Sequence, residues 1–486
     1  MSEKYDVIII GAGIGGLTCG CYLAKSGLKT LILEQHSIPG GYCTSFQRKG
    51  YRFDVGVHYL SSVKRGVLGK VLDELHLRDK ISFTQFDPTD KIILPDNITY
   101  IRANPNDTIE EFVKSFPKDE DKIRIFFNFL LHQDVFSLIA KLKRLTFKDF
   151  LDAHFENEKL KATLGFLLGN IGSPPSQISA IAGAIFYREF ILDPGYYPKG
   201  GIQSFTNAIA EEFSKLKGEL LLSNKVTKIL VDNGAVSGVL TENGQQFYSD
   251  HIVSNADATS TYRDLLGDAN TKEYAIVEKL LTTSSSVALY VGIKNDLNSL
   301  LTESCSIWYS NSYDIEKQLT KLKENLLTEG LQSGMIFFPS LHDNTTNTNK
   351  NVIQAIANAP FETEEFWKSH KEEVMKKLLA LIKKLVPGLK DEDIDISVGA
   401  TPVTFKRYTS NKNGALYGWM PTLEQCDSSP TPQESSFKGL VLAGHWCTSN
   451  IGAKGGIPGV AAMGRNAARI IYSKFEKEWP WPYSLI

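Results

Sequence analysis

The 486-residue sequence lacks most of the short motifs that identify common enzyme classes. Its six cysteines include no C-x-x-C pair, and its nine histidines include no pair at metal-ligand spacing. A P-loop, a G-x-S-x-G motif and tandem repeats are also absent. These absences leave hydrolases and metalloenzymes without support, and we expect no bound metal.

A large charge of either sign is absent too. The formal net charge of −2 offers no general field for a nucleic acid, so we expect no nucleic-acid partner. The first residues have mixed charge rather than the positive charge of a secretion signal. We therefore expect a cytoplasmic protein whose cysteines stay reduced.

One uncharged stretch, Val7 to Ala24, is about as long as a membrane-spanning helix. Glycines interrupt this stretch, which argues against a single helix. A run of β-branched residues, Val7 to Ile10, comes first, and helix-forming residues follow the glycines. We interpret the stretch as a strand, a turn and a helix.

The turn has the pattern G-x-G-x-x-G that binds dinucleotides. Gly11 permits the sharp turn, Gly13 lets the backbone approach a pyrophosphate, and Gly16 lets the helix pack on the sheet. The start of the helix offers unpaired N–H groups and the positive end of a dipole to phosphate. We expect the pyrophosphate to be held by Gly11, Gly13, Ile14, Gly15 and Gly16.

A second strand, Lys29 to Leu33, ends in Glu34, eighteen residues after Gly16. An acid about twenty residues beyond the turn accepts hydrogen bonds from the hydroxyls of an adenosine ribose. It favours FAD or NAD over NADP, whose ribose is phosphorylated. A single fingerprint of this kind favours one permanently held cofactor.

Further glycines favour FAD over NAD. Gly40 and Gly41 give a second place where backbone can approach a long ligand closely. Gly444 and the segment 455–459, which includes Gly456 and Ile457, predict another helix N-terminus near the far end of that ligand. A helix dipole there stabilises the negative charge of a reduced flavin ring.

The chain is long enough for two domains, or for one large domain with an insertion. Strand–glycine–helix units stand at both ends, so we expect both ends to build one cofactor domain around an inserted middle. Residues 107–165 are rich in helix formers. The Asn-Gly pairs at 233–234 and 243–244 predict hairpin turns in a meander that runs from Leu220 to Val253.

Other motifs follow in order along most of the chain. They are Gly40-Gly41-x-x-x-Ser45-Phe46, Gly50-x-x-Phe53-Asp54-x-Gly56-x-His58, Pro174-Pro175-Ser176, Tyr197-Pro198-x-Gly200-Gly201, Lys225-Val226, Thr401-Pro402-x-Thr404-Phe405-x-Arg407-Tyr408, Gly414-Ala415-x-Tyr417-Gly418 and Gly455-Gly456-Ile457-Pro458. Together with the first glycine turn and Glu34, they resemble the FAD-dependent polyene oxidoreductases. That family comprises bacterial-type phytoene desaturases, carotenoid cis–trans isomerases and retinol saturases.

The resemblance implies an α/β fold with a Rossmann-type, glutathione-reductase-like FAD-binding domain and an inserted α+β substrate domain. We predict that the FAD-binding domain is formed by residues 1–100, 200–285 and 437–486, and the substrate domain by 101–199 and 286–436. An apolar tunnel would lead a long conjugated substrate past the flavin.

The resemblance also implies roles for single residues. It places Val226 against adenine, and it places Gly40, Gly41 and residues 54–58 towards the flavin. Many relatives have Gly-Asp where this chain has Gly444-His445, and that acid holds the ribityl chain of FAD. Here either His445 or a backbone group would take the contact.

The implied function is an FAD-dependent oxidoreductase or isomerase that acts on carbon–carbon double bonds of a polyene or another long unsaturated lipid. The reaction would be desaturation, saturation or cis–trans isomerisation. His58 is the candidate catalytic residue, because an imidazole can change its charge near neutral pH; the alternative is a histidine that packs the domain. A flavin amine oxidase and a non-catalytic lipid-binding flavoprotein are the competing functions, and the oligomeric state stays open.

A polyene substrate dissolves in membranes, so contact with a membrane surface is a further expectation. Ile123 to Leu145 mixes phenylalanine and leucine with lysine and arginine, as interfacial helices do. The same pattern also fits a core helix of the inserted domain. The tail from Trp479 to Tyr483 either meets a membrane surface or packs into a groove.

Overall fold

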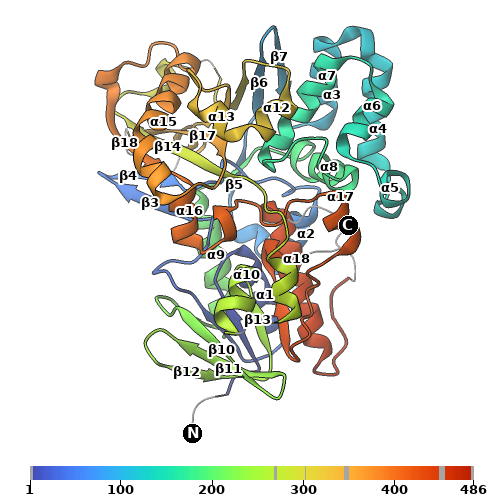
Figure 1. The fold of residues 1–486 in the computed structure, drawn as a ribbon, viewed down its shortest axis with the longest axis vertical. Helices are drawn as coiled ribbons and strands as arrows, with labels where there is room; N and C mark the ends of the chain where they lie inside the picture. The colour runs from blue at the N-terminus through green and yellow to red at the C-terminus, as the bar shows by residue number, and fades with distance from the viewer. Residues whose placement is uncertain (1–3, 268–270, 302, 344–349, 448–454, 483–486) are drawn as a thin grey trace.

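The computed structural model describes residues 4–267, 271–301, 303–343, 350–447 and 455–482. A five-stranded sheet, parallel throughout, forms the lower half of the molecule in Figure 1. Its order is β19 (Leu440–Leu442), β13 (Ile252–Ser254), β1 (Val7–Ile10), β2 (Thr30–Leu33) and β9 (Glu219–Leu221). Segments from both ends of the chain therefore pair with segments from its middle.

The first strand shows how this sheet is buried on both faces. Val7 and Ile9 pack in one apolar cluster with α1 (Ile14–Lys25), α9 (Ile202–Lys215) and α18 (Gly456–Ser473). Ile8 and Ile10 point the other way, into a cluster with Val239 of a separate three-stranded sheet. Burial on both faces explains why the strand is apolar at every position rather than alternating.

Helices from the two ends of the chain lie against each other on this sheet (Figure 1). A Cβ added at Gly464 of α18 would collide with the carbonyl oxygen of Gly15 in α1. The two backbones therefore approach as closely as two glycines allow, which brings the C-terminal helix beside the first turn of the N-terminal one.

The separate sheet is an antiparallel meander of β10 (Val226–Asp232), β11 (Ala235–Thr241) and β12 (Gln246–Tyr248). Asn233 and Gly234 both have positive φ, 50° and 77°, as a tight hairpin turn requires. The predicted hairpins are confirmed, but the predicted meander is too long. Its outer segments, Leu220–Leu222 and Ile252–Val253, contribute β9 and β13 to the parallel sheet instead.

A mixed seven-stranded sheet dominates the other half (Figure 1). Its order is β18 (Ile394–Ala400), β14 (Ser285–Ile293), β17 (Asn351–Ala359), β16 (Ser333–Phe337), β15 (Ser306–Ser310), β6 (Asp90–Leu94) and β7 (Asn97–Ile101). The strands β6 and β7 come from the last part of the segment 1–100, so the chain enters this sheet before residue 101.

One face of this sheet packs on α15 (Glu364–Leu385), through Val287, Leu289 and Val291 of β14. Alternate residues, among them Ala288 and Tyr290, point to the opposite face. We call this opposite face the inner face. It meets the helices α3–α8 and the hairpin of β3 (Ser45–Arg48) and β4 (Tyr51–Asp54).

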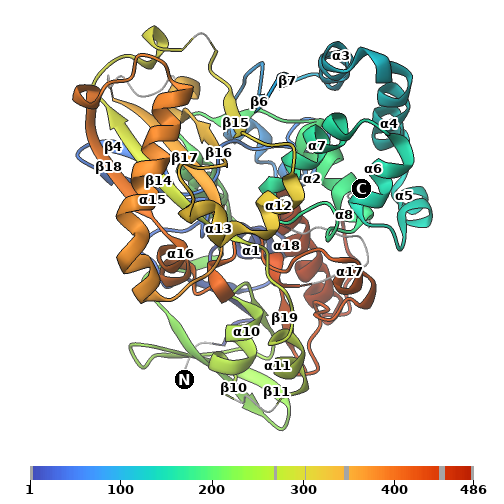
Figure 2. The ribbon, with the colours of Figure 1, turned by 45° about the horizontal axis from the view of Figure 1, so that its top comes forward.

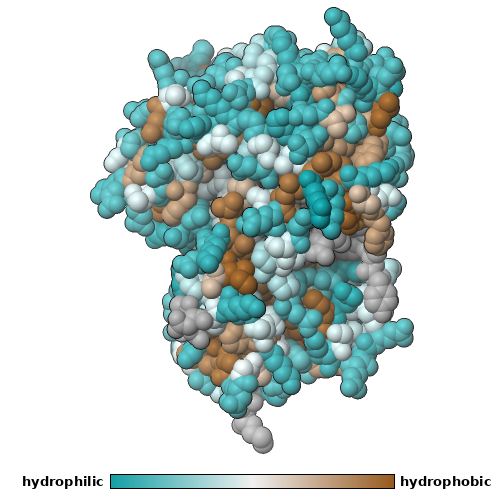
Figure 3. All heavy atoms as spheres, turned by 45° about the vertical axis from the view of Figure 1, so that its right-hand side comes forward, coloured by the Kyte–Doolittle hydropathy of each residue, from teal (hydrophilic) through white to brown (hydrophobic). Residues whose placement is uncertain are grey.

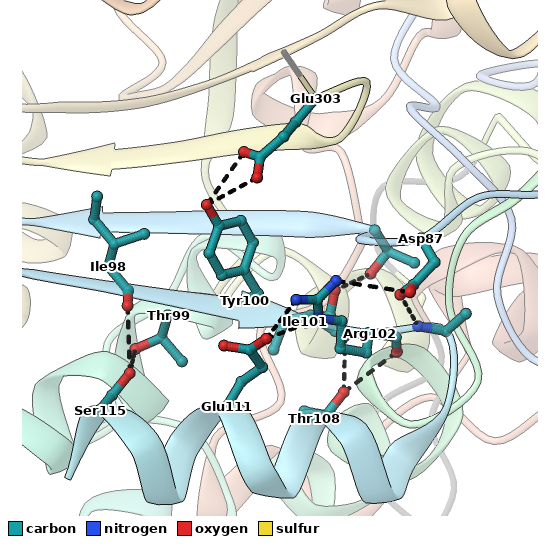
Figure 4. A network of polar contacts seen from close by, with 12 residues as sticks. Asp87, Ile98, Thr99, Tyr100, Ile101, Arg102, Thr108, Glu111, Ser115 and Glu303 are labelled. Atoms are coloured by element: carbon teal, nitrogen blue, oxygen red, sulfur yellow. Dashed lines mark hydrogen bonds and ion pairs between the residues drawn. The ribbon is translucent and has the colours of Figure 1, made fainter.

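The helical part stands beside the edge of the sheet at β6 and β7 (Figure 2). It comprises α3 (Pro105–Ser115), α4 (Glu120–His132), α5 (Val135–Leu142), α6 (Phe147–His154), α7 (Glu158–Phe166) and α8 (Ala180–Phe186). Figure 4 shows how α3 is fastened to β7: Ser115 donates to the carbonyl of Ile98 at 3.3 Å, and Arg102 pairs with Glu111. The edge strand is thereby covered rather than exposed.

The remaining elements connect these parts. They are α2 (Val67–Glu74), β5 (Phe83–Gln85), β8 (Tyr196–Pro198), α10 (Ala258–Ser260), α11 (Lys272–Val277), α12 (Ile315–Thr320), α13 (Leu322–Leu327), α14 (Pro339–His342), α16 (Pro402–Thr409) and α17 (Leu423–Ser428). Within the described residues, no helix is both long and apolar enough to cross a membrane.

The stretch 123–145 forms two helices, α4 and α5, rather than one. Phe126 and Phe127 are fully buried in the apolar cluster of the helical part, as the core interpretation predicted. Phe136 at the start of α5 is 84% exposed. In the tail, Trp479 is buried against Tyr22 and Tyr472, while Tyr483 lies outside the described residues.

Candidate functional site

The glycine turn lies at the carboxyl end of the parallel sheet, where β1 leads into α1. A Cβ at Gly16 would collide with the carbonyl oxygen of Gly11, and one at Gly15 would stand 3.0 Å from the backbone of Gly444. Gly11 has a φ of 95°, which only glycine adopts without strain. The turn thus depends on the absence of side chains, as the sequence predicted.

Glu34 closes β2 beside this turn and is 6% exposed. Its Oε2 accepts a hydrogen bond from the backbone N–H of Ala12 at 2.7 Å, and its Oε1 accepts one from the N–H of His36 at 2.9 Å. Each carboxylate oxygen can accept a further hydrogen bond. The carboxylate is therefore held in place with capacity left for a ligand hydroxyl.

Gly40 and Gly41 lie against the same turn. The N–H of Gly40 donates to the carbonyl of Ala12 at 2.8 Å, and a Cβ at Gly41 would stand 3.5 Å from the Cα of Gly13. The structure thus brings these two glycines to the glycine turn. Val226, at the start of β10, packs with Leu33 at the carboxyl end of β2.

Two helix N-termini in this region have no side-chain cap among the residues that the structure describes. Neither Gly13 before α1 nor Gly455 before α18 makes a side-chain cap, and neither helix has an acidic residue in its first turn. The first N–H groups of both helices are available to an anionic ligand. Gly456 and Ile457, which begin α18, lie at the second of these ends.

His445 follows Gly444 and faces Asn411, with its Nε2 3.5 Å from the amide nitrogen Nδ2. Burial lowers the pKa of His445 to about 4, so its imidazole is neutral near pH 7. Its ring and carbonyl oxygen lie against Gly418. The structure therefore places a neutral hydrogen-bonding group, not a carboxylate, next to Gly444.

Open space lies around Gly56. A Cβ at Gly56 would meet no atom within 4 Å, although Gly56 lies inside the motif between β4 and His58. Tyr417 lies so deep that burial raises its pKa to about 12, yet its side chain keeps accessible surface. Tyr42 is likewise partly accessible and donates to the carbonyl of Ala415. Together with the uncapped helix ends, this open space and these partly accessible tyrosines fit an elongated cofactor with a diphosphate.

His58 is buried within a ring of aromatic side chains. Its imidazole lies edge-on to Tyr59, with ring centres 4.3 Å apart. Phe190, Trp308 and Phe337 surround it at 5.7, 6.2 and 5.7 Å. Its Nε2 is buried without a hydrogen-bond partner among the described residues.

Burial lowers the pKa of His58 to about 3, so the imidazole is neutral near pH 7. The expectation that His58 changes its charge near neutral pH is therefore wrong. That expectation used the ordinary pKa of histidine, whereas apolar surroundings disfavour the charged form. His58 can still offer a neutral donor or acceptor to a bound molecule.

Asp90 fixes two of the rings around His58. Its carboxylate accepts hydrogen bonds from the hydroxyl of Tyr59 at 2.6 Å and from the indole N–H of Trp308 at 2.8 Å. Thr89 donates a third at 3.0 Å. Burial raises the pKa of Asp90 to about 6, and these three donors oppose that rise.

Sequence reasoning missed Asn255, which directly follows β13. A Cβ added at any of five glycines would lie within 4 Å of this residue: Gly11, Gly13, Gly15, Gly16 and Gly444. A signal was present, because ligands in parallel sheets bind beyond the carboxyl ends of the strands. Sequence reasoning missed Asp90 too, since nothing local predicts that β6 and β15 are neighbours.

Comparison with known proteins also indicates a flavin cofactor. The sequence profile of the family described as flavin containing amine oxidoreductase matches residues 14–472. Prolycopene isomerase 2, chloroplastic, of an Oncidium hybrid cultivar is 30% identical over 461 residues, or 86% of this chain and 76% of that protein. All-trans-retinol 13,14-reductase of Danio rerio is 23% identical over 474 residues, or 86% of this chain and 78% of that protein.

Among solved structures, an oxidoreductase from Methanosarcina mazei matches 97% of this chain and 100% of its own, with a TM-score of 0.69 and 18% identity. This likeness confirms the predicted α/β fold of the Rossmann type. The family match confirms that the chain is an enzyme and that its cofactor is the predicted flavin, FAD. The chain belongs to the flavin-containing amine oxidoreductases and, within them, to the FAD-dependent family of carotenoid isomerases and retinol saturases.

Proposed function

We propose that this enzyme uses FAD to act on a carbon–carbon double bond of a polyene, by saturation, desaturation or cis–trans isomerisation. Both relatives named above act, by their names, on carotenoid or retinoid molecules. The observation that carries the proposal is the group of four aromatic side chains around His58, on the inner face of the seven-stranded sheet. Flat aromatic side chains suit a flat conjugated chain.

We propose that three segments of the chain hold FAD. They are the part of residues 1–100 that precedes β6, residues 200–285 and residues 437–486. The uncapped end of α1 supports phosphate binding, the placement of Glu34 supports a bond to the ribose, and the end of α18 supports contact with the flavin. The residues assigned to FAD are Gly11, Gly13, Ile14, Gly15, Gly16, Glu34, Gly40, Gly41, Val226, Gly444, His445, Gly456 and Ile457. When bound, FAD supplies hydride transfer, or a reduced ring that stabilises a transient charge.

The protein's own contribution is to orient the substrate and to exclude water. Asp90 holds the rings of Tyr59 and Trp308 in fixed orientations, so the polyene would meet a preformed slot. His58, neutral and unpartnered at Nε2, would hydrogen-bond to the substrate or to a single water there. No proton transfer by His58 is needed for this role.

The test is anaerobic incubation of the holoenzyme with polyenes, once with oxidised and once with reduced flavin, with products separated by chromatography. Conversion that needs reduced flavin but consumes no reductant indicates an isomerase. Loss of a double bond with consumption of reductant indicates a saturase, and gain of a double bond with flavin reduction indicates a desaturase. Flavin reduction by a primary amine, with no polyene converted, would contradict the proposal and favour an amine oxidase.

We propose, in addition, that α5 touches an anionic membrane surface from which the substrate is drawn. Phe136 is 84% exposed at the start of α5, and Lys141, Lys143 and Arg144 are exposed at its end. An exposed aromatic residue beside cations suits an interface with anionic lipid. On the face shown in Figure 3, hydrophobic residues form several separate patches among hydrophilic ones.

Sedimentation with phosphatidylglycerol vesicles tests this contact. Phe136→Ser is expected to lower the bound fraction several-fold, while Ile98→Ser, at a 48% exposed position on β7, leaves it unchanged. Two results would refute the proposal. One is an equal bound fraction for the two variants; the other is a wild type that binds phosphatidylcholine vesicles as strongly as phosphatidylglycerol vesicles.

A further inference from the structure

A turn of the helical part closes one end of the inner face. This turn, residues 169–173, follows α7 and lies on β14 and β17. The side-chain amide of Asn358 on β17 donates to the carbonyl of Gly169 at 3.0 Å. A Cβ at Gly172 would collide with the hydroxyl of Ser284, which itself donates to Asn358 at 3.1 Å.

Three buried polar side chains lie in this turn or on the strand beside it. Asn170 and Ser173 belong to the turn, and Ser286 lies directly opposite Asn358 in the antiparallel register. They are 7%, 0% and 1% exposed. The Nδ2 of Asn170 and the Oγ atoms of Ser173 and Ser286 are buried without a hydrogen-bond partner among the described residues.

Three buried polar atoms without a partner among the described residues are costly, because each has lost its hydration without gaining a hydrogen bond. Substitution by alanine or leucine would remove that cost. A bound ligand that pairs with these atoms would remove it too. The closed end is also next to a surface pocket of about 370 Å³, whose walls include Gly172 and Ser284.

We infer that Asn170, Ser173 and Ser286 bind a neutral oxygen atom, a hydroxyl or a carbonyl, at one end of an otherwise apolar substrate. Asn170 donates a hydrogen bond through Nδ2, and each serine hydroxyl can donate or accept. None of the three carries a charge, so a carboxylate would lose its hydration there without gaining a cation. This inference rests on the proposed polyene function and narrows it to an oxygenated polyene.

The inner face gives the substrate a direction. Asn358 and Gln354 are four residues apart on β17, or about 13 Å along the strand. Gln354 donates to the carbonyl of Val55, next to Gly56 and the open space around it. A chain whose oxygen sits at the closed end would therefore lie along the face towards His58, which packs on Phe337 opposite Gln354.

The experiment measures binding to the holoenzyme by quenching of tryptophan fluorescence. The probes are all-trans-retinol, the hydrocarbon in which a methyl group replaces its CH₂OH, and retinoic acid. The variants are Ser286→Ala and Asn170→Leu. Thr259→Val is the control, because Thr259 also has a buried hydroxyl, in the short helix α10 beside the other sheet.

We expect the wild type to bind retinol more tightly than the hydrocarbon or the acid. Ser286→Ala and Asn170→Leu should each weaken retinol binding roughly fivefold and leave hydrocarbon binding unchanged. Their melting temperatures should stay equal or rise, and Thr259→Val should change no affinity.

Two results would overturn the inference while leaving the proposed function standing. One is equal binding of retinol and the hydrocarbon by the wild type; the other is a loss of affinity for both probes in the variants. Tighter binding of the acid would refute the neutral oxygen. If the wild type binds none of the three probes, the polyene function fails as well.

Discussion

At the carboxyl end of the five-stranded sheet, five glycines surround one amide, that of Asn255. On the inner face of the seven-stranded sheet, four aromatic rings surround one imidazole, that of His58. The first region is shaped by the absence of side chains and the second by their presence. The shape of the backbone therefore decides which ligand the first region can bind. In the second region, the chemistry of the side chains decides it.

The largest expected effect tests the backbone region. Gly16→Ala places a Cβ against the carbonyl oxygen of Gly11, and neither backbone can yield without moving β1 or α1. We expect a loss of more than about 3 kcal/mol of unfolding free energy, together with loss of bound FAD. Chemical denaturation and the ratio of flavin to protein absorbance measure the two effects.

Gly13→Ala is the matched control in the same motif. Its Cβ would stand 3.0 Å from the Nδ2 of Asn255, which is the end of a side chain and can move. We expect a stable protein with weakened FAD retention. Equal damage by both substitutions would contradict the distinction between backbone and side-chain contacts.

The second prediction separates folding from ligand binding. Gly56→Leu adds a side chain to open space, since no atom lies within 4 Å of the added Cβ, and Gly56 is not among the residues with positive φ. We expect an unfolding free energy within about 0.5 kcal/mol of the wild type, but a purified protein with little flavin. Full flavin occupancy in this variant would show that the space beside Gly56 holds something else.

These two regions also differ in how far the sequence predicts them. Gly11, Gly16 and Glu34 could be assigned because the turn, the strand and their spacing all lie within one short segment. His58 could be found as part of a motif, but its neutral state could not. Three of the four rings that bury it come from β15, β16 and the segment after α8, which only the folded chain brings together.

Strand neighbours explain the other differences. The prediction put residues up to 100 in the cofactor domain, yet β6 pairs with β15, more than 200 residues later. The sequence predicts that Leu220–Leu222 belongs to the meander, whereas the structure pairs β9 with β2. Local patterns predict that a strand exists, and long-range packing decides which strand it joins.

The third prediction concerns Asn255. Asn255→Asp places a negative charge among glycines that would face a pyrophosphate, and we expect roughly a tenfold or larger loss of FAD affinity. Asn255→Leu removes the amide without adding charge and should have a smaller effect. Isothermal titration of the apoprotein with FAD measures both, and Asn243→Asp in an exposed turn serves as the charge control. Unchanged affinity in Asn255→Asp would mean that the diphosphate lies elsewhere.

The smallest effect concerns the aromatic region and pH. In the folded protein burial lowers the pKa of His58 to about 3, whereas in the unfolded chain it has the ordinary value near 6.5. Between these values only the unfolded chain binds the proton, so His58 lowers stability as the pH falls below 6.5, by up to about 1.4 kcal/mol per pH unit. Above pH 6.5 it contributes no pH dependence.

His58→Leu removes this one titration and fills a site whose Nε2 had no partner. Urea denaturation of the variant and the wild type at pH 5, 6, 7 and 8 gives the difference in their unfolding free energies. We expect that difference to be constant at pH 7 and 8 and to grow in favour of the variant by about 2 kcal/mol at pH 5. A difference that stays flat down to pH 5 would mean that the pKa of His58 is the same in the folded and the unfolded protein, so that burial does not hold the imidazole neutral.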